Sequence, residues 1–178
     1  MAVEIIKDFF TQDEIKGIRL IIKKAMESRK TLPVRPEDVI RSEHSLYNFH
    51  YFDNSRLCVY DIDYSPYSYK ITELINQRYP GAQLIANRYI EYSKDWGNAP
   101  ELPLHKDGGK EFEKTKQIMF DYQLDSNIDW DLIAGGDLIS LNNNDACIFN
   151  PYLIEHGRPS KNFNDQDYKK NILFFYSY

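Results

Sequence analysis

The chain has 178 residues, of which 42% are hydrophobic, and this is enough apolar material for one core. We therefore expect a single domain over residues 1–178. The formal net charge is −5 and no run of Lys or Arg could form a phosphate-binding stripe, so we expect no nucleic-acid partner. No stretch approaches the ~20 apolar residues that span a bilayer, and residues 1–8 lack the pattern of a secretory signal, so we expect a cytoplasmic protein with no membrane partner.

Helical spacing characterises two segments of the first half of the chain. Thr11 and Glu14 have the spacing of a capping box, and the apolar residues that follow recur every three or four positions, which predicts a helix over residues 13–28. A second helix is predicted from Ser65 to about Tyr79, because Pro66 suits a helix start and Pro80-Gly81 ends the pattern. Between them, residues 46–52 and 57–62 are rich in aromatic and β-branched residues and predict a hairpin.

Strand patterns replace the helical ones from residue 83 onward. Runs with high β-propensity are separated by Gly, Asn, Asp and Pro, and they cover residues 83–92, 116–124, 137–141, 146–149 and 171–178. The economical architecture is a mainly β fold with flanking helices (α+β), in which residues 1–82 form the helices and hairpin and residues 83–178 form a closed or nearly closed antiparallel sheet. Cys58 and Cys147 are isolated, so we expect small buried residues in a reducing compartment.

One tripeptide carries the spacing of a metal site. In an extended segment His105 and Asp107 point to the same side, so they could bind one ion together. His156 follows the apolar run 147–149, and a neighbouring strand could bring it to the same place. Two imidazoles and one carboxylate suit a non-haem Fe(II) centre with open positions for a co-substrate and O₂, and zinc would use a similar set.

The tripeptide alone is weak evidence, because such a sequence also occurs by chance in solvated loops. The other two histidines, His44 and His50, have no carboxylate two residues away and are interpreted as ordinary histidines of the early hairpin. Support for the metal site therefore depends on the rest of the β half.

The β half resembles, element by element, the prolyl-4-hydroxylase-like branch of the Fe(II)/2-oxoglutarate-dependent dioxygenase superfamily. That family has a strand ending in Tyr, an HxD tripeptide, a strand ending near Leu-Asn or Leu-Asp, a Gly-Gly-x-Leu strand, a distal His and a basic last strand. The corresponding elements here are residues 87–92 (Asn-Arg-Tyr-Ile-Glu-Tyr), 105–107 (His-Lys-Asp), 120–125 (Phe-Asp-Tyr-Gln-Leu-Asp), 135–138 (Gly-Gly-Asp-Leu), His156, and 169–175 (Lys-Lys-Asn-Ile-Leu-Phe-Phe).

The resemblance implies a double-stranded β-helix (jelly-roll, cupin-like) core that binds Fe(II) and uses 2-oxoglutarate and O₂. It implies an oxygenase that hydroxylates a C–H bond of an amino-acid, peptidyl (prolyl-type) or small-metabolite substrate and releases succinate and CO₂. The catalytic and metal residues would be His105, Asp107 and His156. Asp107 argues against halogenation, because related halogenases have a small residue there. The alternative is a non-catalytic, cupin-like metal- or ligand-binding module.

The resemblance also implies a set of co-substrate residues. Lys169, 13 positions after His156, corresponds to the cation that pairs with the far carboxylate of 2-oxoglutarate, and Asn171 would share its face. Lys170 is the alternative if the register differs by one. Tyr92 would supply a hydroxyl to the same carboxylate. Two further residues are placed beside the co-substrate, namely Gln123 and Leu138.

Three further residues are candidates for substrate binding. Arg88 shares a strand face with Tyr92 and could pair with an anionic substrate group, or else form a structural ion pair. Arg158 could orient substrate near the mouth or lie on the surface before Pro159, and Asp121 shares a face with Gln123. Residues 93–104 and 107–116 are expected to form a lid.

Overall fold

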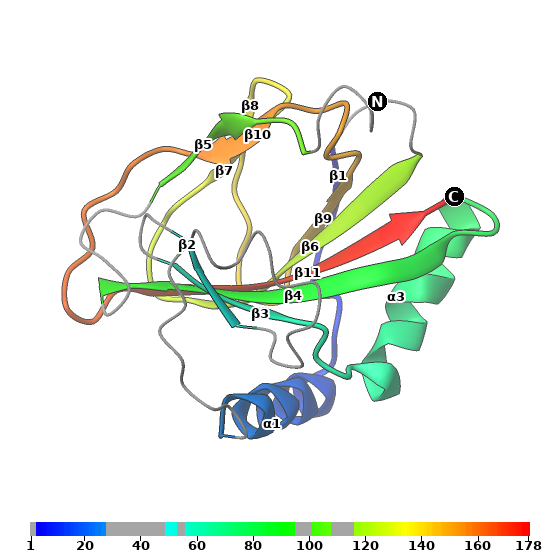
Figure 1. Ribbon diagram of the computed structural model, residues 1–178, viewed down its shortest axis with the longest axis horizontal. Helices are drawn as coiled ribbons and strands as arrows, with labels where there is room; N and C mark the ends of the chain where they lie inside the picture. The colour runs from blue at the N-terminus through cyan, green and yellow to red at the C-terminus, as the bar shows by residue number, and fades with distance from the viewer. Residues whose placement is uncertain (1–2, 28–48, 53–55, 95–100, 108–115) are drawn as a thin grey trace.

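The computed structural model describes residues 3–27, 49–52, 56–94, 101–107 and 116–178, with the backbone alone for residues 49–52 and 60 (Figure 1). His44 and most of the two predicted lid segments lie outside these ranges. The side chain of His50 does so too.

A seven-stranded antiparallel sheet forms the base of the fold. Its strands, from edge to edge, are β1 (Glu4–Ile6), β9 (Ala146–Phe149), β6 (Gln117–Ser126), β11 (Tyr168–Ser177), β4 (Gln83–Ser93), β3 (Arg56–Tyr60) and β2 (Phe49–Phe52). The central strands β6, β11 and β4 have ten or eleven residues each, so they run the length of the sheet. We refer to it as the large sheet.

A four-stranded antiparallel sheet lies across from the large sheet, at the top of Figure 1. Its strands, in order, are β5 (Leu102–His105), β10 (His156–Arg158), β7 (Leu132–Ala134) and β8 (Asp137–Ile139). Strands β7 and β8 are joined by Gly135 and Gly136, which both have positive φ, as a tight two-residue hairpin loop requires. The two sheets together form the double-stranded β-helix, or jelly-roll, and we refer to the second as the small sheet.

Two helices cover the face of the large sheet that points away from the small sheet (Figure 1). Helix α1 (Gln12–Glu27) begins at the predicted capping box: the Thr11 amide donates to Glu14 Oε2 at 2.7 Å and the Glu14 amide donates to Thr11 Oγ1 at 3.3 Å. Helix α3 (Ser65–Arg78) has Pro in its first turn, as predicted. Both helices bury isoleucines in the core beneath the sheet. Neither has the length and hydropathy that a membrane crossing requires.

Successive residues of β11 belong to different environments. Ile172, Phe174 and Tyr176 pack against the helices. Asn171, Leu173 and Phe175 point to the other side, where they line a cavity between the two sheets. Lys169 is on the face of Asn171, whereas Lys170 is on the helix side and lies 3.9 Å from Glu91. Cys58 on β3 and Cys147 on β9 are buried and form no disulfide, as predicted.

Candidate metal centre

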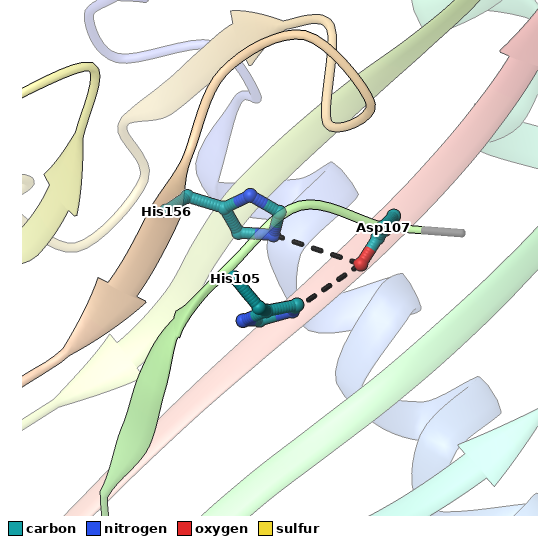
Figure 2. Close-up of side chains that lie close together, drawn as sticks. All are labelled: His105, Asp107 and His156. Atoms are coloured by element: carbon teal, nitrogen blue, oxygen red, sulfur yellow. Dashed lines mark ion pairs between the residues drawn. The ribbon is translucent and has the colours of Figure 1, made fainter. Parts of the chain in front are cut away.

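Two neighbouring strands of the small sheet bring the predicted metal ligands together (Figure 2). His105 ends β5 and is the direct cross-strand partner of His156, the first residue of β10. Asp107 follows β5, and its backbone amide donates to the Pro151 carbonyl at 2.9 Å, which fixes the chain just after the strand. Residues 51 positions apart in the sequence thus share one edge of the cavity.

The side chains converge on a common point. Asp107 Oδ1 lies 3.3 Å from His105 Nε2 and 3.8 Å from His156 Nε2 (Figure 2). One potential ligand atom from each residue lies within 4.8 Å of the others. The two rings are tilted by 45° with centroids 4.4 Å apart, and both lie on the same side of the carboxylate in Figure 2. Among the described residues this is the one cluster of histidine, cysteine or carboxylate groups with such spacing.

Each imidazole is oriented by its own strand. Nδ1 of His105 lies 2.8 Å from the Pro103 carbonyl, and Nδ1 of His156 lies 3.1 Å from the Ile154 carbonyl. A carbonyl can only accept, so each neutral ring carries its proton on Nδ1 and presents the Nε2 lone pair to the centre. This pairing is the usual support for a metal-binding histidine, because it fixes both the tautomer and the ring plane.

The cluster is open on one side. The His156 side chain is 5% exposed, whereas those of His105 and Asp107 are 37% and 26% exposed. When His105 is protonated its Nε2 donates a hydrogen bond to Asp107, which raises the pKa of His105, and burial lowers the pKa of His156. Burial alone would raise the pKa of Asp107, but His105 and nearby positive charge outweigh it and lower the pKa. All three groups are thereby held in electrostatic contact.

A cavity leads from this cluster to the interior between the sheets. It is lined by residues from both sheets, including all three predicted ligands. Its apolar walls are Ile90, Leu102, Met119, Leu132, Leu173 and Phe175. Its charged and polar residues, apart from the ligands, are Arg56, Arg88, Tyr92, Asp121, Arg158 and Asn171.

Lys169 lies beyond Asn171 on the same face of β11 and is 2% exposed. It is the cross-strand partner of Tyr92 and donates a hydrogen bond to Gln123 Oε1, while Gln123 Nε2 donates to the Leu141 carbonyl at 2.7 Å. Burial, together with the charge of Arg158, lowers the pKa of Lys169 to about 7. The three predicted co-substrate residues Lys169, Tyr92 and Gln123 are therefore adjacent.

A buried polar triad lies beside them. Asn171 Nδ2 donates to Asp121 Oδ1 at 2.7 Å, and Asp121 Oδ2 lies 3.7 Å from Arg158 Nη2. Arg158 also donates to the Trp130 carbonyl at 2.7 Å and lies over the Trp130 ring. Because Asp121 fixes the orientation of the Asn171 amide, Asn171 Oδ1 is left without a hydrogen-bond partner among the described residues. Arg158 is buried, so the surface position considered from the sequence is wrong.

One predicted co-substrate residue is not brought to this site. Leu138 lies on the edge strand β8 and is 69% exposed, and it does not line the cavity. Its strand is part of the small sheet, but β8 is separated from β10 by β7. The placement of Leu138 beside the co-substrate is therefore wrong for this structure.

Two residues of the site had no signal in the sequence. Arg56 enters the cavity from β3, because β3 pairs with β4 in a register that sets Arg56 opposite Tyr92. Gly157 separates His156 from Arg158, and a Cβ there would lie 2.5 Å from the Leu102 carbonyl oxygen. Strand β5 can approach β10 this closely only because that position is glycine.

No protein-family model matches the sequence, and no curated protein matches it. The structure does match solved structures. One is HygX from Streptomyces hygroscopicus with nickel, 2-oxoglutarate and hygromycin B bound, with a TM-score of 0.67, 10% identity, and 98% of this chain and 82% of that chain covered. Another is a Pseudomonas putida prolyl-4-hydroxylase, with a TM-score of 0.66, 10% identity, and 98% and 91% covered.

A third match is the non-haem α-ketoglutarate-dependent epimerase SnoN from nogalamycin biosynthesis. Its TM-score is 0.68 at 7% identity, and the alignment covers 98% of this chain and 76% of that chain. At these identities the likeness establishes the fold. The chain therefore shares its double-stranded β-helix fold with a prolyl-4-hydroxylase and an α-ketoglutarate-dependent epimerase.

Proposed function

We propose that this protein is a non-haem Fe(II)- and 2-oxoglutarate-dependent oxygenase. One observation carries the proposal: Nε2 of His105, Nε2 of His156 and Oδ1 of Asp107 converge at the open edge of a cavity in a double-stranded β-helix. Arg158 lines that cavity, and Lys169 is buried beside it as the cross-strand partner of the lining residue Tyr92. This arrangement supports a metal site at the cavity and a carboxylate site next to it.

The residues present fit a divalent iron. Two neutral imidazoles and one carboxylate are the donor set that non-haem Fe(II) oxygenases use, with further coordination positions left for ligands. The Nδ1 contacts to Pro103 and Ile154 carbonyls already turn both rings toward the centre. When bound, Fe(II) with 2-oxoglutarate and O₂ supplies the oxidising chemistry, in which 2-oxoglutarate is converted to succinate and CO₂.

The protein's own residues have three tasks. His105, Asp107 and His156 hold the metal at the open edge. Lys169, with Tyr92 beside it, binds the far carboxylate of the co-substrate, which needs a cation where water is excluded. The apolar walls near Met119 and Leu173 exclude water around the reacting C–H bond. We propose hydroxylation of an amino-acid, peptidyl or small-metabolite substrate.

Anaerobic titration tests the metal centre. Purified apoprotein should bind one Fe(II), and the loaded protein should then bind 2-oxoglutarate and release succinate under O₂. His105→Ala, Asp107→Ala and His156→Ala should each abolish Fe(II)-dependent succinate release. Asp137→Ala, an exposed aspartate on β8, is the matched control and should behave like the wild type.

The co-substrate site has its own pair of variants. Lys169→Ala should weaken 2-oxoglutarate binding by about a hundredfold to several thousandfold, with Fe(II) binding nearly unchanged, because it leaves a buried carboxylate unpaired. Lys170→Ala is the control, since Lys170 lies on the helix side of β11. Equal losses in the two variants would contradict the assignment. Metal binding without any 2-oxoglutarate binding would indicate a non-catalytic, cupin-like module instead.

A further inference from the structure

Two arginines enter the cavity from the wall opposite the small sheet. Arg88 of β4 shares a strand face with Ile90 and Tyr92, and its guanidinium lies 4.7 Å from the centroid of the Phe175 ring. That aromatic contact fixes the plane of the guanidinium against β11. Arg56 enters from β3, the neighbouring strand. Both side chains are half-buried and line the same cavity as the metal ligands.

The charges of both arginines act on the cavity residues. Burial raises the pKa of Cys58, and Arg56 and Arg88 both oppose that rise. Both arginines therefore act on Cys58, and both line the cavity that the proposed metal ligands also line.

The cavity walls carry an excess of positive charge among the described residues. Three arginines line it, against the two carboxylates Asp107 and Asp121. Asp107 is held by the two histidines, and Asp121 is held by Asn171 and Arg158. A divalent metal and a dianionic co-substrate cancel each other, so the charges of the described lining residues still sum to one positive charge when both are bound. A site of this kind favours an anion as its third occupant.

We propose that the substrate carries a carboxylate that binds Arg88, with Arg56 as a second positive charge beside it. This inference rests on the proposed oxygenase function and names the substrate class for the same site. The planar guanidinium of Arg88 suits a carboxylate, which it can bind with two parallel hydrogen bonds. Ile90, Met119, Leu173 and Phe175 provide apolar surface for the body of the substrate. The substrate is therefore an apolar carboxylic acid, either free or at the end of a peptide.

Arg158 is the less suitable arginine for this role. It is 4% exposed and is already bound to the Trp130 carbonyl, with Asp121 on its other side. Its charge also adjoins Lys169, at the end where the co-substrate carboxylate is expected. The substrate carboxylate is thus assigned to Arg88 and Arg56, and the co-substrate carboxylate to Lys169 beside Arg158.

The test compares carboxylates with their amides. Protein loaded anaerobically with Fe(II) and 2-oxoglutarate is titrated with two pairs of probes, leucine with leucinamide, and a prolyl peptide with a free carboxyl terminus with its amidated form. The carboxylate of at least one pair should bind about tenfold or more tightly than its amide. The leucine pair and the peptide pair distinguish a free amino acid from a peptide terminus.

Matched variants assign the preference to a residue. Arg88→Gln should weaken carboxylate binding by about tenfold to a hundredfold and leave amide binding unchanged, because a charged hydrogen bond is lost. Arg56→Gln should have a smaller effect in the same direction. Arg19→Gln is the control, since Arg19 is a half-exposed arginine of α1 that pairs with Asp125. It should retain the wild-type preference.

Three results of the probe titrations would overturn the proposal. They are equal binding of carboxylates and amides, an unchanged preference in Arg88→Gln, and no binding of either carboxylate at millimolar concentration. A loss of 2-oxoglutarate binding rather than probe binding in Arg88→Gln would also overturn it, because Arg88 would then serve the co-substrate. Failure of the wild type to bind 2-oxoglutarate at all would count against the oxygenase function, and the carboxylate preference is then measured on the Fe(II)-loaded protein alone.

Discussion

The two faces of the large sheet differ in what they bury. The face toward α1 and α3 buries isoleucines, phenylalanines and tyrosines in one continuous apolar core. The face toward the small sheet buries charges as well: Lys169, Asp121 and Arg158 are all less than 5% exposed. Neighbouring residues of one strand, such as Asn171 and Ile172, therefore face different environments, the cavity and the apolar core.

The difference separates stability from ligand binding. Apolar burial stabilises the fold, whereas burying an ion costs several kcal/mol before its partners are counted. A fold that needed only a second core would have apolar residues on both faces. Charges on one face, placed around a cavity, mark the face that is adapted to a ligand. Substitutions on the helix side should accordingly change the free energy of unfolding, whereas substitutions on the cavity side should change the affinity for ligands.

The largest expected effect is on the helix side. Phe174→Ala should lower the free energy of unfolding by about 3–5 kcal/mol, because Phe174 is buried against Tyr64 and Phe120 and its removal leaves a cavity. Urea denaturation of the apoprotein measures the change. The folded fraction of Phe174→Ala should bind Fe(II) with wild-type affinity. A loss of Fe(II) affinity in the folded variant would mean that the two faces are not independent.

The next effect is a pH dependence of the free energy of unfolding, caused by Lys169 on the cavity side of the large sheet. The pKa of Lys169 is lower in the folded state, about 7, than in the unfolded chain, so the unfolded chain binds more protons above pH 7. The free energy of unfolding should therefore rise by about 1–2 kcal/mol between pH 7 and 8.5, through this residue alone. Lys169→Met should flatten that rise in a denaturation series, while Lys170→Met keeps it. A rise that persists in Lys169→Met would show that Lys169 is not the source.

A third effect concerns the close contact between β5 and β10. Gly157→Ala places a Cβ 2.5 Å from the Leu102 carbonyl oxygen and 3.0 Å from Leu104 backbone atoms, so β5 must move and carry His105 with it. The dissociation constant for Fe(II) should rise by about tenfold, measured by anaerobic titration. Leu104→Ala on the same strand changes an exposed side chain and should leave the affinity unchanged. Equal affinities in Gly157→Ala and the wild type would show that the strand contact does not position the metal ligands.

The smallest effect is expected for a substitution of Lys170, the lysine of β11 on the helix side. Lys170→Gln removes an ion pair with Glu91 at 3.9 Å, and a partly exposed pair of this kind contributes less than about 0.5 kcal/mol. Neither unfolding nor 2-oxoglutarate binding should change measurably. A marked loss of 2-oxoglutarate binding would place the co-substrate cation one residue later than proposed.

Much of this arrangement could be predicted where the pattern is local. The capping box at Thr11 needs only neighbouring residues and was predicted in the observed form. Alternation along β11 was also predicted, with two registers left open, and the structure has the one in which Lys169 shares the face of Asn171. The long strands β4 and β6 and the strand β9 were also predicted close to their observed bounds. The pairing of His105 with Asp107 followed from the two-residue repeat of an extended chain.

The missed features depend on contacts between distant segments. Strands β1, β5, β7 and β10 have only three or four residues each, too few for a periodic pattern, and they exist because a neighbouring strand pairs with them. Arg56 reaches the cavity through the register of β3 with β4. The exposure of Leu138 follows from the position of β8 at a sheet edge. The prolyl-4-hydroxylase-like branch, the cytoplasmic location and the absence of a nucleic-acid partner stay predictions.

The metal ligands lie on two strands that meet only when the small sheet has formed. Under the proposed function, a metal bound there would link residues 105–107 to residue 156, because the unfolded chain holds these groups far apart on average. The stability of the small sheet then depends on the free concentration of the metal ion. At a free metal concentration a hundred times the dissociation constant, the folded state gains about 2.7 kcal/mol. The apoprotein should therefore lose the pairing of β5 with β10 first, and hydrogen exchange at the amides of these two strands should slow most when the metal is added.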